Sequence, residues 1–192
     1  QVVMGFPVSQ KGVHYVHGCG RIAKSQMTTI RDAEITDVPA LARMCAFAGW
    51  PWLGNEIDLY QYLSRGYIRC LVAENCGEVT GFVTLNLAEY WGKRVTIEEL
   101  YVIPRVRNSR TAYMLVREAW KRLETTGWLR ASAYVRDDND FMLLFLHKLG
   151  WKEETALRNY DPDGATYRLF TKRIPEGFMR RHKYETVGNA TG

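Results

Sequence analysis

A strand–helix–strand pattern in the middle of the chain limits the choice of folds more than any other segment. A β-rich run at 95–104 stops at Pro104, which cannot donate to a strand ladder, and another β-rich run follows at 129–135. Between them, apolar residues recur at helical spacing until Gly127. A helix that links two neighbouring parallel strands requires a crossover, so we expect a mixed sheet around it. The apolar residues of the helix are Ala112, Leu115, Val116, Ala119, Trp120 and Leu123.

The flanking segments add further strands and helices to this unit. The turn Asn75-Cys76-Gly77 joins two β-rich runs and predicts a hairpin, and a DPDG turn near the end of the chain predicts another. An α/β (α+β) fold with one compact domain is therefore expected. The further elements expected in chain order are a strand at 28–32, a helix from about residue 37, a helix ending near residue 65, strands at 68–74 and 79–87, a helix at 140–149, and strands at 151–160 and 165–171.

Positive charge is concentrated at the two ends of the chain. The net charge is +5, yet residues 1–26 hold three basic and no acidic side chains, and residues 172–192 hold five basic and two acidic ones. We expect a basic N-terminal extension at 1–26, a domain at 27–171 and a basic C-terminal tail at 172–192. The ends are either solvated tails or attract an acidic protein or nucleic acid, although the body carries no nucleic-acid recognition motif.

Composition favours a cytoplasmic protein. No apolar run approaches the ~20 residues of a membrane span, and the first residues lack a signal-peptide pattern. The four cysteines lie far apart, which fits a reducing compartment. His14, His17 and Cys19 are close in sequence but lack a fourth ligand, so no metal site is expected.

Four segments in the right order resemble the GNAT superfamily of N-acetyltransferases. They are TIRDAEITDVPAL, ENCGEVTGFV, IEELYVIPRVR and DDNDFMLLFLHKLGW, and the likeness spans about residues 28–171. The resemblance implies a mixed, mostly antiparallel sheet of six to seven strands flanked by about four helices. It also implies transfer of an acetyl group from acetyl-coenzyme A (acetyl-CoA) to a primary amine.

A coenzyme pyrophosphate needs several backbone N–H donors, which the first turn of a helix supplies. The turn at 107–112 is placed for that role. In the family this loop reads Arg or Gln, two residues, Gly, one residue, then Gly or Ala, and here Arg110 replaces the first glycine. Arg110 either blocks the amides or holds a phosphate itself. The expected cofactor-binding loop is Arg107, Asn108, Ser109, Arg110, Thr111 and Ala112.

The resemblance also suggests residues along the pantetheine arm and in the acceptor pocket. Val102 corresponds to the strand residue whose backbone pairs with pantetheine, and Asn139 to a side chain near it, although Asn139 could equally be only a helix N-cap. Four aromatic residues lie where the family forms its acceptor pocket, but such residues are more often core. They are Trp50, Trp52, Tyr60 and Tyr67.

Two glutamates are the candidate catalytic residues. Glu98 and Glu99 lie where family members deprotonate the amine, and in an extended strand they point to opposite faces, so that only one can serve. The four-residue offset from Val102 favours Glu98, while the alternative is that both are solvent-facing strand residues. The family's usual proton donor, a tyrosine, is replaced by Leu146.

These replacements leave two hypotheses for the function. The first is an active N-acetyltransferase that binds acetyl-CoA and no metal. The second is a catalytically inactive GNAT-fold binding or structural protein with a degenerate active site, similar to small virion-associated proteins of some bacteriophages, in which case it would be found in the host cytoplasm or the virion.

Overall fold

The computed structural model describes residues 28–50, 53–88, 93–107, 110–124, 126–160 and 162–174. The strands in these residues are β1 (Thr29–Asp32), β2 (Ile68–Asn75), β3 (Glu78–Asn86), β4 (Arg94–Val102), β5 (Arg130–Arg136), β6 (Lys152–Leu157) and β7 (Tyr167–Arg173). The helices are α1 (Val38–Phe47), α2 (Glu56–Leu63), α3 (Thr111–Glu124) and α4 (Asp140–Lys148), with short 3-10 turns η1 (Ile35–Asp37) and η3 (Pro104–Val106).

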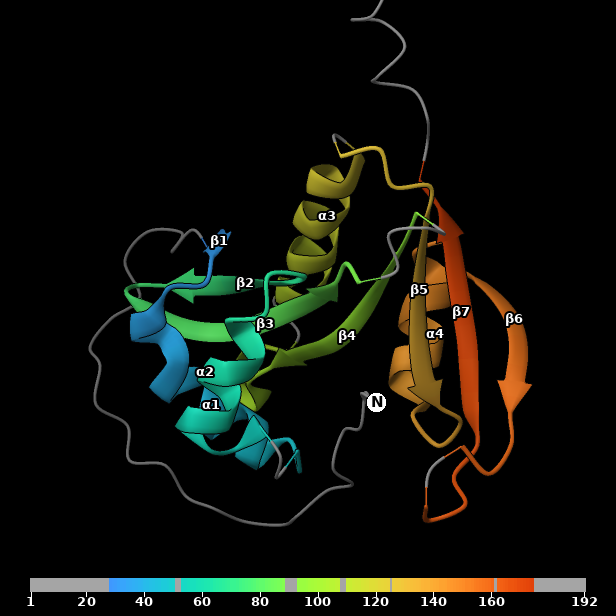
Figure 1. Cartoon of the computed structure of the whole chain (residues 1–192), viewed down its shortest axis with the longest axis horizontal. Coiled ribbons are helices and arrows are strands. Elements are labelled where there is room, and N and C mark those ends of the chain that lie inside the picture. Colours follow the sequence, from blue (N-terminus) through green and yellow to red (C-terminus); the bar gives the residue numbers. More distant parts are fainter. Residues whose placement is uncertain are drawn as a thin grey trace, which may run out of the picture.

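All seven described strands form one sheet in the order β1-β2-β3-β4-β5-β7-β6 (Figure 1). Among these strands, β4 and β5 form the single parallel pair, and every other neighbouring pair is antiparallel. The crossover that joins β4 to β5 contains α3, as the strand–helix–strand pattern predicts. The expected mixed, mostly antiparallel sheet is therefore confirmed.

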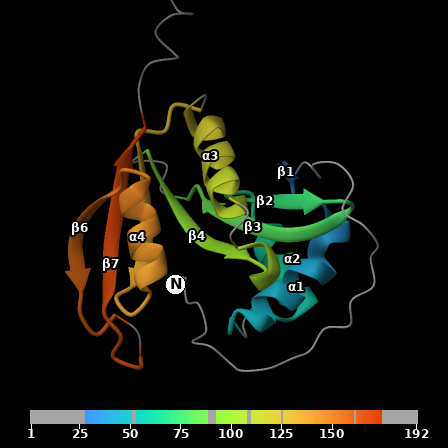
Figure 2. The ribbon, with the colours of Figure 1, turned by 180° about the vertical axis from the view of Figure 1, so that it is seen from behind.

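Two hydrophobic clusters cover the two faces of the sheet. On one face, α1 and α2 pack on β2, β3 and β4, with Leu41 and Leu59 fully buried. On the other face, α3 and α4 contribute Leu115 and Leu146, and Figure 2 shows α4 in front of β5 and β7. The sheet is thus the central layer, and each pair of helices forms a core with one of its faces.

The parallel pair β4–β5 separates part of the way along the sheet. Pairing begins at Arg94 and Arg130 and ends at Ile97 and Ala133, after which β5 no longer pairs with β4. Figure 1 shows the two strands diverging from this point. The last residues of β4 consequently lie at the edge of an opening in the sheet, where an extended ligand can approach their backbone.

Glycine holds β3 close to β4 beside this opening. A Cβ atom at Gly81 would lie 2.7 Å from the carbonyl oxygen of Tyr101 and 3.0 Å from a methyl group of Val102. Any larger residue would push the two strands apart. The close approach therefore fixes β4 where it separates from β5.

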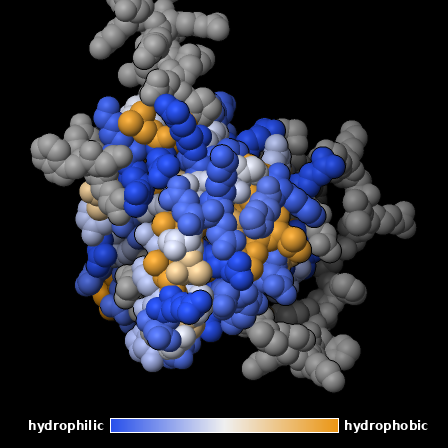
Figure 3. Space-filling model, turned by 90° about the vertical axis from the view of Figure 1, so that its right-hand side faces the viewer, coloured by the Kyte–Doolittle hydropathy of each residue, from blue (hydrophilic) through white to orange (hydrophobic). Residues whose placement is uncertain are grey.

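The surface is mainly hydrophilic, with smaller apolar areas visible from the side of β6 (Figure 3). Phe141 and Leu144 on α4 are more than half exposed. Of the described helices, none is long and apolar enough to cross a membrane. The expected basic ends fall almost wholly outside the described residues, as do His14, His17 and Cys19.

Candidate active site

Glu98 and Glu99 lie on the same face of β4. Val83 pairs with Leu100 and Leu85 pairs with Ile97, so Thr84 alone stands opposite both glutamates. This is a β-bulge, in which two residues of one strand oppose one residue of its neighbour. The expectation that the two side chains point to opposite faces is therefore wrong, because the bulge turns both toward α2.

Glu98 is half-buried and receives a hydrogen bond on each carboxylate oxygen. The hydroxyl of Tyr62, from α2, donates to Oε2 at 2.5 Å, and Nδ2 of Asn86, at the end of β3, donates to Oε1 at 2.7 Å. An ionised carboxylate offers acceptors on both oxygens, so these two donors suit it. The position of Glu98 is thus fixed from two elements.

Glu99 is completely buried beside Glu98. Oγ1 of Thr84 accepts the backbone N–H of Glu99 at 2.9 Å and donates to Oε2 of its carboxyl group. Oε1 has no hydrogen-bond partner among the described residues. Burial raises the pKa of Glu99 to about 8 and the charge of Glu98 adds to this, while the hydrogen bond from Thr84 and the contact with the hydroxyl of Tyr62 oppose it.

Tyr62 joins the two glutamates. Its hydroxyl oxygen lies 3.1 Å from Oε2 of Glu99 as well as 2.5 Å from Oε2 of Glu98. Burial, followed by the charges of the two glutamates, raises the pKa of Tyr62 well above its usual range, so its proton stays in place. The sequence does not single out Tyr62, because it follows Leu59 at the spacing of an ordinary core position.

The four aromatic candidates for an acceptor pocket have different environments. Trp50 is buried in the core, with its ring edge-on to Phe82 and Tyr101. Tyr60 and Tyr67 are 48% and 40% exposed, and Trp52 lies outside the described residues. The core interpretation thus holds for Trp50 alone among the three that are described.

Arg107 and Val102 meet just after β4 ends. Nε of Arg107 donates to the backbone carbonyl of Val102 at 3.1 Å, and its guanidinium carbon lies 5.7 Å from the ring centre of Tyr101. The side chain of Val102 is buried in the core on the α3 side. The structure therefore brings two of the expected cofactor-binding residues together beside the opening between β4 and β5.

Arg110 adopts a backbone conformation that favours glycine. Its φ is +64°, in the left-handed region, and its side chain is exposed. Its carbonyl accepts the N–H of Met114 at 2.9 Å, so α3 starts directly after it, with Thr111 buried and Ala112 half-buried. The loop thus keeps a left-handed turn at this position without a glycine, while Asn108 and Ser109 fall outside the described residues.

The chain matches the family model described as acetyltransferase (GNAT) family over residues 35–151, more than half of its length. The chain belongs to the GNAT family. Solved structures with the same fold include the ribosomal-protein-S18-alanine N-acetyltransferase from Escherichia coli, with 22% identity, coverage of 77% of this chain and 94% of that chain, and a TM-score of 0.67. Ard1 from Thermoplasma volcanium has 20% identity, coverage of 78% and 99%, and a TM-score of 0.68.

A third solved structure is a mutant of a spermidine N-acetyltransferase from Vibrio cholerae. It is 15% identical, covers 82% of this chain and 99% of that one, and has a TM-score of 0.69. At these identities the likeness concerns the fold. The sequence-based resemblance to the GNAT superfamily is confirmed by the family match and the shared fold together.

In this GNAT domain Asn139 caps α4. Its Oδ1 accepts the N–H of Met142 at 3.2 Å, and the residue is 8% exposed. The N-cap interpretation of Asn139 is thus observed, while contact with a cofactor stays a prediction. Leu146 is buried in the hydrophobic cluster on the α3–α4 face of the sheet, and its side chain has no proton to donate.

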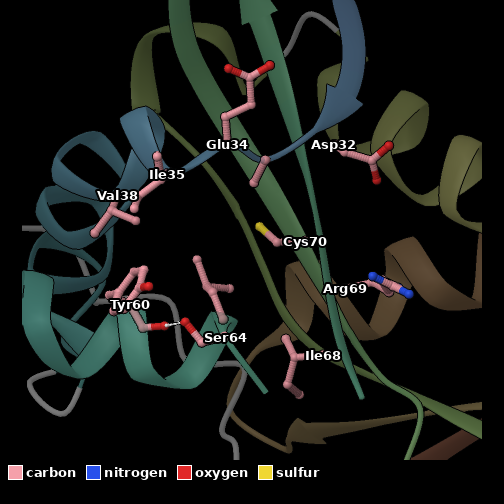
Figure 4. Close-up of a pocket in the computed structure, with 11 residues that line it drawn as sticks. Asp32, Glu34, Ile35, Val38, Tyr60, Ser64, Ile68, Arg69 and Cys70 are labelled. Atoms are coloured by element: carbon pink, nitrogen blue, oxygen red, sulfur yellow. Dashed lines mark hydrogen bonds between the residues drawn. The ribbon is translucent and has the colours of Figure 1, made fainter. Parts of the chain in front are cut away.

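A groove on the α1–α2 side of the GNAT domain is shown in Figure 4, and neither of the two glutamates is among the residues that line it. Its volume is about 280 Å³, and Figure 4 shows Cys70 and Ile68 of β2 on one side of it, with Tyr60 and Ser64 of α2 and its C-cap on the other. Tyr62, on the same helix, is absent from its lining. Helix α2 therefore contributes to two different sites, the groove and the glutamate pair.

Proposed function

We propose that this GNAT domain transfers an acetyl group from acetyl-CoA to a primary amine. The observation that carries the proposal is the carboxyl group of Glu98, held by Tyr62 and Asn86 just beyond the last residue of β4 that pairs with β5. An amine that enters from the α1–α2 face meets this carboxylate where the sheet opens. Family membership supports acetyl-CoA as the donor.

In the proposed reaction Glu98 acts as general base. Its carboxylate takes a proton from the ammonium form of the substrate, directly or through one water molecule. The neutral nitrogen then attacks the carbonyl carbon of the thioester, the carbon–sulfur bond breaks, and the thiolate of coenzyme A leaves and takes up a proton. Leu146 cannot supply that proton, so the solvent or another group does.

The cofactor would lie between the end of β4 and the start of α3. The first-turn N–H groups of α3, near Thr111 and Ala112, and the positive end of the helix dipole suit a pyrophosphate. The exposed guanidinium of Arg110 adds a positive charge beside them. The remaining proposed contacts are Arg107, Asn108 and Ser109 in the loop, and Val102 and Asn139 along the pantetheine arm.

The variant Glu98→Gln tests the proposed base. It should lower kcat near neutral pH by the ~10²–10⁴-fold that is typical of a lost general base, because an amide cannot accept the proton, while acetyl-CoA affinity stays nearly unchanged. Steady-state assays over a panel of amines, with calorimetry for the cofactor, measure both quantities. Glu118→Gln, on α3, is the matched control and should keep full activity.

The opposite outcome would favour the second function. If Glu98→Gln is as active as the wild type, Glu98 has no part in the mechanism. If the wild-type protein binds acetyl-CoA but acetylates no amine, the inactive GNAT-fold binding or structural protein, for example a phage virion component, becomes the better description. The replacement of the family's tyrosine by Leu146 is the observation that favours it.

A further inference from the structure

We propose that Glu98, Tyr62 and Glu99 form one proton-sharing unit, in which Glu99 is the neutral member and Tyr62 is the positioning residue that links it to Glu98. The proposal rests on the proposed function for its catalytic consequence, because Glu98 is the base of that reaction. The protonation of the unit itself is a property of the folded protein and needs no substrate.

Tyr62 has one hydroxyl proton for two short contacts with carboxyl oxygens. Its hydroxyl oxygen lies 2.5 Å from Oε2 of Glu98 and 3.1 Å from Oε2 of Glu99. The shorter contact takes the tyrosine proton. If Glu99 were ionised, the longer contact would bring two proton-free oxygen lone pairs together in a buried site. A proton on Oε2 of Glu99 turns this contact into a hydrogen bond from Glu99 to Tyr62.

The surroundings of Glu99 also favour its neutral form. The carboxyl group is fully buried, and among the described residues its side-chain partners are the hydroxyl groups of Tyr62 and Thr84, with no ion pair to an arginine or lysine. Its Oε1 lacks a hydrogen-bond partner there. The free-energy cost of burying an oxygen without a partner is much smaller for the carbonyl of a neutral carboxylic acid than for an oxygen of a charged carboxylate. The raised pKa of about 8 agrees with this arrangement.

The other titratable and charged groups near the unit come from three elements. Cys45 on α1 and Cys70 on β2 face Glu99, and burial raises the pKa of both thiols, so they stay neutral. The guanidinium carbon of Arg65, which follows the C-cap of α2, lies 5.6 Å from the ring centre of Tyr62. The unit therefore carries one negative charge at neutral pH, and that charge is on Glu98.

This distribution suits a general base. A second negative charge next to Glu98 would repel the charge of the first in a buried site, and a neutral Glu99 avoids that repulsion. With Glu99 neutral and Tyr62 donating to Glu98, the carboxylate of Glu98 is held in place to accept the proton of the amine. The proton moves from the substrate nitrogen to Glu98, and no other group needs to change its charge.

Infrared spectroscopy of the folded protein tests the proposal directly. At pH 7 the wild type should show the C=O band of a protonated carboxylic acid, and Glu99→Gln should lose it while Glu98→Gln keeps it. Tyr62→Phe should shift the band, because Glu99 loses its acceptor. Tyr60→Phe, two residues earlier on α2, is the matched control and should leave the band unchanged, and circular dichroism checks that each variant is folded.

The kinetic consequence provides a second readout. Tyr62→Phe should lower kcat while the KM for the amine and the affinity for acetyl-CoA stay nearly unchanged, because Glu98 loses one of the two hydrogen bonds that position its carboxylate. A kcat equal to that of the wild type would show that Tyr62 does not position Glu98.

The infrared result decides the proposal even if no acetyl transfer is found. A wild-type protein without the band at pH 7, or a band that persists in Glu99→Gln, overturns it. Failure of the proposed function has a different signature, because it appears as missing acetyl-CoA binding or turnover while the band is still present.

Discussion

At the scale of single residues, two buried carboxyl groups show how a neighbouring cation decides the protonation state. Asp37 is 6% exposed, but Arg31 binds it with two hydrogen bonds of 2.7 and 2.9 Å and holds the pKa of Asp37 below its usual range. Glu99 is completely buried, and among the described residues its carboxyl group contacts only the hydroxyl groups of Tyr62 and Thr84. The first group is therefore part of a structural ion pair, and the second is a buried acid.

The buried acid predicts an unusual pH dependence of stability. The folded pKa of Glu99, about 8, is above the ordinary value of 4.5, so the folded state binds more protons than the unfolded state between these values. The contribution of Glu99 is fully present below about pH 4.5 and is lost as the pH rises toward 8, by at most about 1.4 kcal/mol per pH unit. The melting temperature of Glu99→Gln, relative to that of the wild type, should therefore be higher at pH 8 than at pH 5. Thermal unfolding at the two pH values measures this difference.

Glu154→Gln, on the exposed strand β6, is a suitable control for that series. Glu154 pairs with Arg130 at the surface, and its replacement should shift the melting temperature by a similar small amount at both pH values. If the difference between Glu99→Gln and wild type does not change between pH 5 and pH 8, then Glu99 is ionised in the folded protein.

At the scale of elements, some features follow from periodicity and others do not. The apolar stripe of α3 predicts the helix because one face of it is buried, and Leu115, Val116, Ala119 and Leu123 are indeed buried. The β-bulge at Glu98 could not be found in this way, since it depends on how β4 pairs with Thr84 of another strand. The role of Tyr62 depends on the same pairing.

The backbone conformation of the loop before α3 likewise could not be predicted from its sequence. From sequence, Arg110 in place of glycine either blocks the amides or replaces them as a phosphate ligand. The positive φ of Arg110 and its exposed side chain reveal that the left-handed turn is kept and that the guanidinium lies at the surface. A residue type alone does not disclose a backbone angle, because an unfavourable conformation can be maintained by its surroundings.

We predict that Arg110 favours acetyl-CoA binding. Arg110→Ala should weaken binding by several-fold or more, because a charge-assisted contact to phosphate is lost, and the loss should shrink at high salt. Arg110→Gly should weaken it similarly while relieving the strained φ. Calorimetric titration with acetyl-CoA measures both affinities. Tighter binding by either variant would mean that Arg110 obstructs the site.

At the scale of the whole molecule, the sheet is what connects the two proposed binding sites. The opening between β4 and β5 faces the start of α3 on the cofactor side, and the bulge on β4 presents Glu98 toward α2 on the acceptor side. The order of strands and helices was predictable because every element has its own period and end signals. The opening and the bulge arise only when the strands are assembled.

The most direct test of the proposed acetyltransferase is calorimetric titration of the full chain with acetyl-CoA. We expect saturable binding with one molecule per chain, competition by coenzyme A, and an affinity that is unchanged in Glu98→Gln and lower in Arg110→Ala. A protein that binds no acetyl-CoA at millimolar concentration would not be an acetyltransferase of this kind.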